Sequence, residues 1–446
     1  MFSLNAVDRG TGLRRCILNG LGSALAAAAV ASELVLRPAS RVVFTDGETP
    51  GGRATVRDEL PLIELSGAPT DLGASAGRLL AGQIRPLLRL MGLHPPLIAA
   101  RLLGRVEPLT TGIPDAHRLE IAAMAAAVGI PASRLERANL VVDTCCSALV
   151  RGADPTAGRP LAIGRNMDFY PAAVLGPGTM VALMRPTGKH AFVSVGWPGY
   201  AGVVSGMNAH GVCACILLNY GAHGVRPGTP IGFRAREVLE DAHDLAGAIA
   251  RFSSSPVASS HYLLMADASG AAVCWHDGQR VHRHDLDQRG WLACSNGGRD
   301  PVTRQAIDDR GRCLRSLATG APADPMRTEA WLRRAMTASY LRGINTQAML
   351  FVPEKRILQL ALGTGIRAAA LNHWIDLDLT QAFAGAPLAT APLSRLPPVP
   401  DPARHYTDAT PASDHTASGA SSHPGKAAAV AADEPQRERT PANTSR

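Results

Sequence analysis

The chain has 446 residues, of which 46% are hydrophobic and 18% are charged, and it contains 44 glycines and 33 prolines. This length suits one large domain or two, and this composition excludes a chain that is disordered throughout. The formal net charge is +8, but the basic residues are scattered and aromatic residues are few, so we expect no nucleic-acid partner. The eight cysteines have neither disulfide-framework nor zinc-knuckle spacing, and we expect no metal and no cofactor.

The first 36 residues have the pattern of an export signal. Arg14 and Arg15 precede an apolar run from Cys16 to about Ser32, and small residues lie at 29–31. The run is short for a membrane span, so residues 1–36 are predicted to be an export signal or a membrane anchor. The protein would then be periplasmic or membrane-attached. If the run is only an alanine-rich surface helix, the protein would be cytoplasmic.

Residues 37–61 are rich in glycine, proline and threonine and are predicted to form a linker. Apolar residues at helical spacing follow in three stretches, at 71–91, 115–129 and 131–143. The sequence therefore predicts a helical N-terminal segment over residues 62–145.

Beyond residue 145 the hydrophobic period changes to that of short strands. Apolar stretches bounded by glycine, proline, asparagine or aspartate indicate strands, and residues 231–252 have the pattern of one long amphipathic helix. We expect an α+β core at 146–387 and a disordered tail at 388–446, where proline, alanine, serine and threonine dominate. The expected strands are 160–166, 190–197, 211–220, 261–267, 271–278, 291–296 and 356–363.

Two further patterns suggest chemistry but have simpler explanations. The stretch GASAG, residues 73–77, matches the G-x-S-x-G motif of serine hydrolases, but Ser75 falls inside a predicted helix and not after a strand. Small residues in a closely packed helix explain it better, and a serine hydrolase using Ser75 is only a minor alternative. A metal could be imagined among four residues of a predicted hairpin, but an exposed hairpin without metal is the favoured interpretation. These four are His276, His282, His284 and Asp285.

The stretch VVDTCCSALV, residues 141–150, places Cys145 and Cys146 side by side before Ser147. Polar residues follow at the ends of predicted strands, where a rigid scaffold presents reactive groups, and they are expected to converge on one cleft. Each of them alone could equally be a turn residue. They are Arg165, Asn166, Asp168, Asn208, Asn219 and Asn296.

At these residues the chain resembles the cysteine branch of the N-terminal-nucleophile hydrolases. The similarity is to peptidase family C45 with the acyl-coenzyme A:6-aminopenicillanate acyltransferases, and more distantly to choloylglycine hydrolases and penicillin V acylases. It runs from about Ile63 to Phe383 and includes GRNMDF, GMNAHGV, PIGFRAREVLE, CSN and LALGTG. The resemblance implies a four-layer αββα sandwich that is made as an inactive precursor and cuts itself before a cysteine.

The implied chemistry gives the two cysteines different roles. Cys145 would supply the carbonyl of the cleaved bond, and Cys146, followed by Ser147 as in the family, would become the N-terminal nucleophile. Its freed α-amine, with a pKa of about 7.7 to 8.0, would act as general base for its own thiol. Cleavage before Cys145 is the alternative, and two inert buried thiols are the simplest interpretation.

The resemblance also assigns roles to the downstream residues. Asp168 would bond the new ammonium or the thiol, and Arg165 would balance that carboxylate. Asn219 and Asn296 would orient the substrate and form the oxyanion hole. Asn166 and Asn208 would contact the substrate.

Two functions from different classes follow. The first is a self-processing amidohydrolase or acyltransferase that acts on a linear, non-peptide amide of a small acyl compound through a thioester on Cys146, with acyl-coenzyme A as a conceivable donor. Its two fragments would stay packed together, with the N-terminus as a possible membrane attachment. The second is an exported binding or scaffold protein with the same fold and no catalysis. It is motivated by the export signal, the tail and Gly297, where the family often has histidine; the acyltransferases also often have glutamine where this chain has Arg165.

Overall fold

We describe the protein from a computed structural model. It describes residues 42–91, 107–140, 145–169, 172–219, 226–296, 309–319, 328–365 and 367–389. All of these belong to one compact unit, Met1–Pro402. The predicted export signal and almost all of the predicted tail lie outside the described residues. No described helix has the length and apolar character needed to cross a membrane.

Ten of the described strands form a larger sheet, in the order β1-β2-β3-β6-β7-β8-β9-β10-β11-β12. Neighbouring strands are antiparallel, except that β3 pairs with β6 in parallel. The strands are β1 (Gly47–Thr49), β2 (Gly52–Arg57), β3 (Leu60–Gly67), β6 (Met180–Pro186), β7 (Phe192–Gly196), β8 (Ser205–Asn208), β9 (Cys213–Leu218), β10 (His261–Ala266), β11 (Ala271–His276) and β12 (Val281–Asp285).

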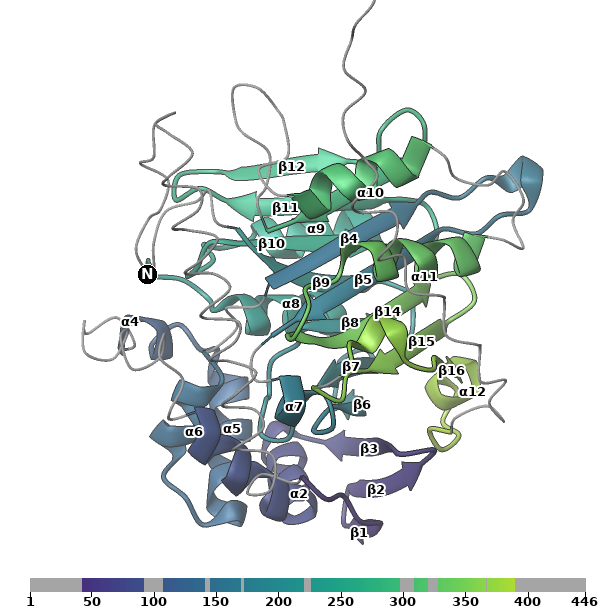
Figure 1. Cartoon of the computed structure of the whole chain (residues 1–446). Coiled ribbons are helices and arrows are strands. Elements are labelled where there is room, and N and C mark those ends of the chain that lie inside the picture. The colour runs from purple at the N-terminus through teal and green to yellow at the C-terminus, as the bar shows by residue number, and fades with distance from the viewer. Residues whose placement is uncertain are drawn as a thin grey trace, which may run out of the picture. The chain divides into compact units, whose positions relative to one another are not determined.

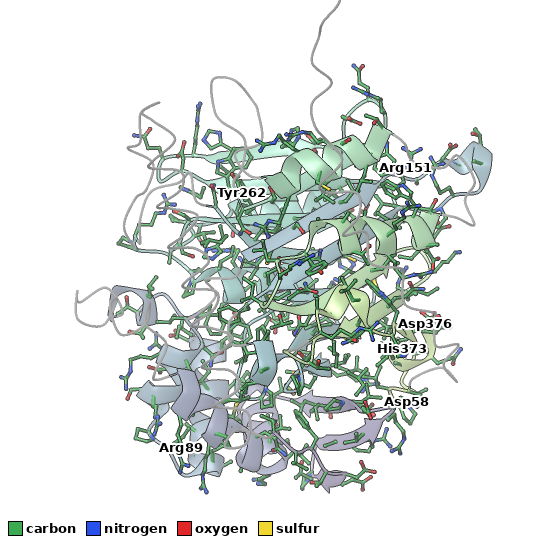
Figure 2. The ribbon with its side chains drawn as sticks, viewed as in Figure 1. Asp58, Arg89, Arg151, Tyr262, His373 and Asp376 are labelled. Carbon is green, nitrogen blue, oxygen red and sulfur yellow. The ribbon has the colours of Figure 1, made fainter. Side chains whose placement is uncertain are left out.

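Six further strands form a smaller antiparallel sheet, in the order β13-β4-β5-β14-β15-β16. The strand that begins at the cysteine pair, β4, is therefore an interior strand with a partner on each side. At its far end the Arg151 guanidinium lies 4.3 Å from the centre of the Trp291 ring (Figure 2). The strands are β4 (Cys145–Arg151), β5 (Ala162–Asp168), β13 (Trp291–Ser295), β14 (Asn345–Val352), β15 (Ile357–Leu362) and β16 (Ile375–Asp378).

The two sheets pack face to face, and helices cover their outer faces (Figure 1). Strands β4 and β13 contact β9 across the interface, where an apolar core lies. Helices α10 (Asp309–Thr319) and α11 (Thr328–Ser339) lie on the smaller sheet, while α8 (Ile231–Asp241) and α9 (Leu245–Ser253) lie on the larger one. These contacts confirm the four-layer αββα arrangement that the resemblance implied.

The remaining described helices are mostly short. The prediction of helices near 71–91 and 115–129 is confirmed, and the second ends where Gly129 adopts a left-handed conformation with φ of 73°. Its N–H and that of the next residue bond back to carbonyls of the last turn, as in a Schellman end. The elements are α2 (Pro69–Met91), α4 (Glu107–Thr110), α5 (Asp115–Val128), α6 (Ala132–Ala138), η1 (Pro155–Ala157), α7 (Ala172–Leu175), η3 (Ala369–Leu371) and α12 (Thr380–Phe383).

Two expectations about the N-terminal part are wrong. Residues 47–57, predicted as linker, form β1 and β2 at the edge of the larger sheet, and residues 60–67 form β3 inside the segment predicted to be helical. Glycine and proline at 50–52 make the turn between β1 and β2, so their abundance marked a hairpin. The N-terminal segment therefore supplies strands to the core as well as helices.

The predicted helix at 231–252 is in fact two helices. Ala242 is extended, with φ of −90° and ψ of 134°, and the Asp244 side chain accepts a hydrogen bond of 2.7 Å from the N–H of Gly247. An aspartate at this position caps a new helix and so stops the old one. The hydrophobic period continued across the break and concealed it.

A buried ionic cluster joins the helices before the cysteine pair to those after it. Arg236 of α8 forms two hydrogen bonds to the Glu120 carboxylate of α5, at 2.9 and 2.6 Å, and one to Glu240 at 2.8 Å. The side chains of Arg236 and Glu120 are each only 2% exposed. Although burial raises the pKa of Glu240, Arg236 and His117 hold it down at about 2.

We expect Arg236→Met to destabilise the protein by about 3–5 kcal/mol at neutral pH, because it leaves two buried carboxylates without their cation. The loss should shrink as the pH falls towards about 4, where those carboxylates take up protons. Denaturant unfolding at the two pH values measures it. Arg57→Met, at an exposed ion pair, is the control and should cost less than about 1 kcal/mol. Equal losses in the two variants would contradict the expectation.

Candidate active site

Cys146 is the second residue of β4 and is fully buried between the two sheets. It lies opposite Met167 in the β4–β5 ladder. Because side chains alternate along a strand, Cys146 and Ala148 face the larger sheet, whereas Ser147 and Leu149 face the helices. The strand alternation therefore directs the Cys146 thiol into the interface of the sheets.

The Cys146 sulfur is contacted by a buried guanidinium. Nη2 of Arg165, on the neighbouring strand β5, lies 3.2 Å from Sγ and donates a 2.6 Å hydrogen bond to the carbonyl of Ile216 in β9. Arg165 is fully buried, and its Nε and Nη1 have no hydrogen-bond partner among the described residues. Arg165 therefore places buried N–H donors and a positive charge beside the Cys146 thiol.

The backbone nitrogen of Cys146 is bound by Asn296, at the end of β13. Asn296 Oδ1 accepts a short hydrogen bond from this N–H, while Asn296 Nδ2 donates to the carbonyl of Leu218 at 2.9 Å. Nη2 of Arg310, from α10, also donates to Asn296 Oδ1, at 2.7 Å. The nitrogen and the sulfur of Cys146 are therefore held by different side chains.

Asp168 lies at the end of β5 and pairs with Arg310, whose Nη1 is 3.1 Å from Asp168 Oδ2. Its other oxygen accepts from Asn345 Nδ2 at 2.8 Å and from the N–H of Leu341 at 3.3 Å. Burial raises the pKa of Asp168 to about 6, although Arg310 and these hydrogen bonds act in the opposite direction. Arg310 thus links Asp168 to Asn296 and, through Asn296, to the Cys146 nitrogen.

This arrangement differs from two of the expected roles. The Asp168 carboxylate is balanced by Arg310 and not by Arg165, which contacts the thiol instead. Residues three apart on a strand point to opposite faces, so Arg165 and Asp168 cannot share one partner. Asn296 uses its oxygen to hold the Cys146 nitrogen, and its amide nitrogen donates to the carbonyl of Leu218, whereas a role in an oxyanion hole had been expected.

The three other predicted asparagines are placed differently. Asn219 directly follows β9, next to the carbonyl that Asn296 contacts, and is 4% exposed. Asn166 faces α11, where its Nδ2 bonds the carbonyl of Met336 at 2.9 Å, so it does not share the face of the Cys146 thiol. Asn208 lies at the opposite end of β9, and its Nδ2 donates to Leu239 and Ala242 of the α8 end at 3.0 and 2.8 Å.

Sequence reasoning missed Arg310. It belongs to a helix that packs on the smaller sheet, and its guanidinium is buried beside Asp168 and Asn296. No motif of the sequence surrounds it, and many arginines of this chain lie on predicted helices. The sequence could have indicated a further cation in one way: a carboxylate buried at Asp168 requires a positively charged partner.

Ser75 is not positioned as a hydrolase nucleophile. It lies inside α2, is 1% exposed, and donates a 2.7 Å hydrogen bond to the carbonyl of Pro50. A Cβ on Gly73 would lie 2.0 Å from the Glu120 carbonyl of α5, so the small residues of GASAG permit close helix packing. The serine-hydrolase alternative is therefore wrong.

The predicted hairpin with three histidines is formed by β11 and β12. His282 bonds Asp277 and stacks on Trp275, with ring centres 5.0 Å apart. These partners hold His282 as part of the hairpin. The one group of metal-ligating side chains that gathers among the described residues lies elsewhere, at His190, His210 and His243.

A small apolar cavity of ≈ 40 Å³ opens near the end of β5. Phe169 lines it and directly follows β5, two residues beyond Met167, the ladder partner of Cys146. The volume equals that of a few waters at about 10–15 Å³ each. Its other lining residues are Leu87, Leu88, Ala138, Leu175, Trp197, Pro198, Gly199 and Tyr200.

One known protein family matches part of this chain. Residues 156–303 match the family described as acyl-coenzyme A:6-aminopenicillanic acid acyl-transferase. The match begins after Cys146 and includes Arg165, Asp168, Asn219 and Asn296. It confirms the resemblance for this segment. No curated protein matches the chain.

Several solved structures are similar in fold at low sequence identity. An N-acylethanolamine-hydrolyzing acid amidase ortholog from Caenorhabditis elegans is 18% identical with a TM-score of 0.40, over 47% of this chain and 93% of that one. The penicillin V acylase from Agrobacterium tumefaciens is 14% identical with a TM-score of 0.36, over 52% and 92%. An R18L variant of the conjugated bile acid hydrolase from Clostridium perfringens is 10% identical with a TM-score of 0.40, over 57% and 99%.

The raised pKa of Asp168 predicts a pH-dependent stability. Between its unfolded value near 3.9 and about 6, the folded protein holds a proton that the unfolded chain releases, so the Asp168 contribution to stability falls as the pH rises through this window. Relative to Asp168→Asn, the free energy of unfolding of the wild type should fall by up to about 3 kcal/mol between pH 4 and pH 7. Denaturant titrations of both proteins measure this difference.

Asp58→Asn is the matched control for that measurement. Asp58 is exposed and has φ of 50°, a conformation that asparagine also tolerates. The difference between this variant and the wild type measures what an exposed aspartate contributes over the same pH range. A constant difference between the wild type and Asp168→Asn would contradict the raised pKa.

Proposed function

We propose that this chain is a self-processing cysteine amidohydrolase or acyltransferase with Cys146 as its N-terminal nucleophile. The observation that carries the proposal is the separate handling of the two Cys146 atoms. Its sulfur lies 3.2 Å from the Arg165 guanidinium, and its nitrogen is bound by Asn296. A residue whose thiol attacks while its own nitrogen accepts the proton requires both atoms to be held.

Processing begins with attack of Cys146 Sγ on the carbonyl carbon of Cys145. The C–N bond breaks, a thioester between the two residues forms, and the Cys146 nitrogen takes the proton from the thiol and becomes an amine. Water then hydrolyses the thioester, which releases the Cys145 carboxylate and restores the thiol. Asn296 Oδ1, which accepts the N–H of this bond in the intact chain, remains an acceptor for the new ammonium.

Turnover repeats this chemistry on an external amide. The α-amine of Cys146 takes the thiol proton, and Sγ attacks the substrate carbonyl to give a tetrahedral intermediate with a negatively charged oxygen. Asn219, which follows β9 beside the Asn296 contact, is the side chain that we assign to this oxyanion. The amine leaving group takes the proton, and water or an acceptor amine then removes the acyl group from sulfur.

Asp168 and Arg310 position these groups without touching the substrate. Arg310 is bonded to Asp168 Oδ2 and Asn296 Oδ1 at once, so the orientation of the amide oxygen depends on a charged pair. A fixed amide oxygen keeps the amine of Cys146 next to its thiol. Arg165 contributes positive charge beside the sulfur, where negative charge develops before attack.

The apolar cavity near Phe169 suggests the substrate class. It is lined by Phe169, the residue that follows β5, and its volume of ≈ 40 Å³ has room for a short apolar acyl group. A small-molecule amide with such an acyl group is the proposed substrate, and acyl-coenzyme A would donate through the same thioester. Product analysis with and without an added amine acceptor distinguishes hydrolysis from transfer.

Export remains part of the proposal because of the pattern of residues 1–36. Mass spectrometry of the native protein reads the start of the first fragment and the start of the second in one measurement. A first fragment beginning near residue 32 indicates a removed signal, and retention in the membrane fraction indicates an anchor.

Cys146→Ala should abolish processing, because it removes the attacking thiol, while Cys145→Ala should still be cut, because its carbonyl remains. Intact-mass spectrometry of the purified proteins measures this: we expect one full chain for the first variant and two fragments for the second and the wild type. Two fragments from Cys146→Ala would contradict the nucleophile assignment. An intact wild-type chain that still binds acyl ligands would favour the scaffold alternative.

Arg165→Met should lower kcat/KM for an N-acyl amide about 100-fold or more, because the charge beside the developing thiolate is lost. Arg165→Lys should recover part of the loss. Arg333→Met is the control, since Arg333 bonds Gln359 on the outer side of the smaller sheet and should keep nearly full activity. An Arg165→Met enzyme that folds, is processed and retains activity would remove Arg165 from the mechanism.

A further inference from the structure

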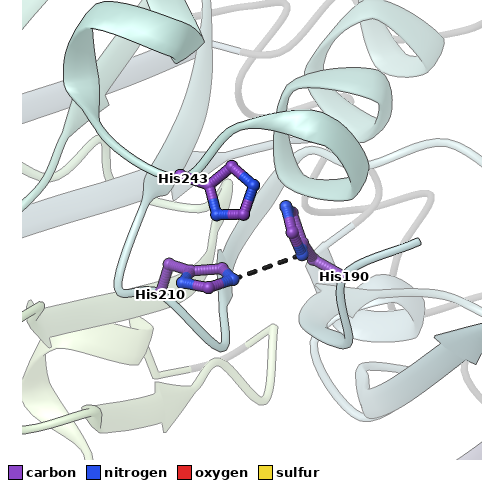
Figure 3. Close-up of side chains that lie close together, drawn as sticks. All are labelled: His190, His210 and His243. Atoms are coloured by element: carbon purple, nitrogen blue, oxygen red, sulfur yellow. Dashed lines mark hydrogen bonds between the residues drawn. The ribbon is translucent and has the colours of Figure 1, made fainter. Parts of the chain in front are cut away.

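Three histidines that the amide chemistry does not use converge on one spot (Figure 3). His190 lies between β6 and β7, His210 between β8 and β9, and His243 between α8 and α9. Their ring centres are 4.3 to 4.5 Å apart, and one ligand nitrogen of each lies within 4.8 Å of the others. His210 Nε2 and His190 Nδ1 are 3.2 Å apart.

We propose that this trio binds a divalent transition-metal ion of the zinc class. In a tetrahedral zinc site with Zn–N distances of about 2.0–2.1 Å, two nitrogen ligands are about 3.3 Å apart. The His190–His210 pair already has that separation, and side-chain rotation would bring the third ring in. An all-imidazole set suits zinc, cobalt, nickel or copper and not magnesium or calcium, which prefer oxygen ligands.

The backbone around the trio fixes the three loops before any ion arrives. Asn208 accepts from the N–H of His210 at 3.0 Å and donates to the carbonyls of Leu239 and Ala242, which ties the β8–β9 turn to the end of α8. The N–H of His190 donates to the carbonyl of Glu240 at 3.0 Å in the same helix turn. All three loops therefore meet at one helix end, whose partial negative charge favours a cation.

The three rings differ in their exposure to solvent. His190 is half-buried, while His210 and His243 are exposed, so an ion can reach the site from solvent.

Neighbouring charged side chains are already bound by other groups. Lys189 bonds Asp241 at 2.6 Å, and Arg251 contacts the other oxygen of Asp241 at 3.0 Å. The Arg356 guanidinium, near His210, is held by the carbonyls of Ala209 and Pro353 at 2.9 and 2.6 Å. The trio lies at the opposite end of β9 from Asn219, so a bound ion would fasten loops and would not take part in the amide chemistry.

The test uses the purified full chain, reduced and freed of metal by chelation. Titration with Co²⁺ should give one saturable equivalent with a visible absorption spectrum of nitrogen ligation, and Zn²⁺ should displace it. His243→Ala, at an exposed position that should leave folding intact, should weaken Co²⁺ binding by more than about tenfold. His373→Ala, at an exposed histidine outside the trio, is the control and should bind as the wild type does.

Thermal unfolding provides a second readout. Zn²⁺ should raise the melting temperature of the wild type and of His373→Ala, and it should have no such effect on His243→Ala. Mg²⁺ should have none on any of them. Equal Co²⁺ binding by His243→Ala and the wild type, a thiolate charge-transfer band in place of the nitrogen spectrum, or no saturable binding would each overturn the proposal.

Discussion

The parallel pairing of β3 with β6 is the constraint on which the rest of the structure depends. Strand β3 precedes the cysteine pair and β6 follows it, and their register runs from Leu62 with Val181 to Gly67 with Pro186. The Arg236–Glu120 pair joins the same two parts through buried charges. If the chain is cut before Cys146, these contacts keep both fragments in one core, because removal of either would expose a sheet edge and an unpaired buried charge.

Strand alternation then decides what each polar residue of the site can do. Cys146 and Arg165 face the interface of the sheets, while Asp168 lies on the side of α10. The site therefore has two charged parts, a cation beside the sulfur and an Arg310–Asp168 pair behind the nitrogen, and Asn296 joins the second part to Cys146. Both parts are buried, where an electrostatic contact is stronger than in water.

The sequence predicted correctly those features that depend on residues close together in the chain. Seven predicted strands were found because short apolar runs end in turn residues, but β4, which begins at the cysteine pair, was not among them. The sequence was uninformative where a partner is distant, as for Arg310. The break at Ala242 and the strands at 47–57 had local signals, a capping aspartate and a glycine–proline turn, that were read as a continuing helix and a linker. Asn208 was predicted to contact the substrate because it is a polar residue at a strand end. In the structure it connects a turn to α8.

The two ends of β9 support two different groups, the Cys146 nitrogen and the turn that carries His210. At one end the carbonyl of Leu218 holds Asn296, and with it the Cys146 nitrogen. At the other end Asn208 holds the turn that carries His210. Because β9 is central in the larger sheet and all its residues are buried, neither end can shift without disturbing the core between them. A metal ion at the histidines would therefore stabilise the strand that positions the nucleophile, while remaining outside its chemistry.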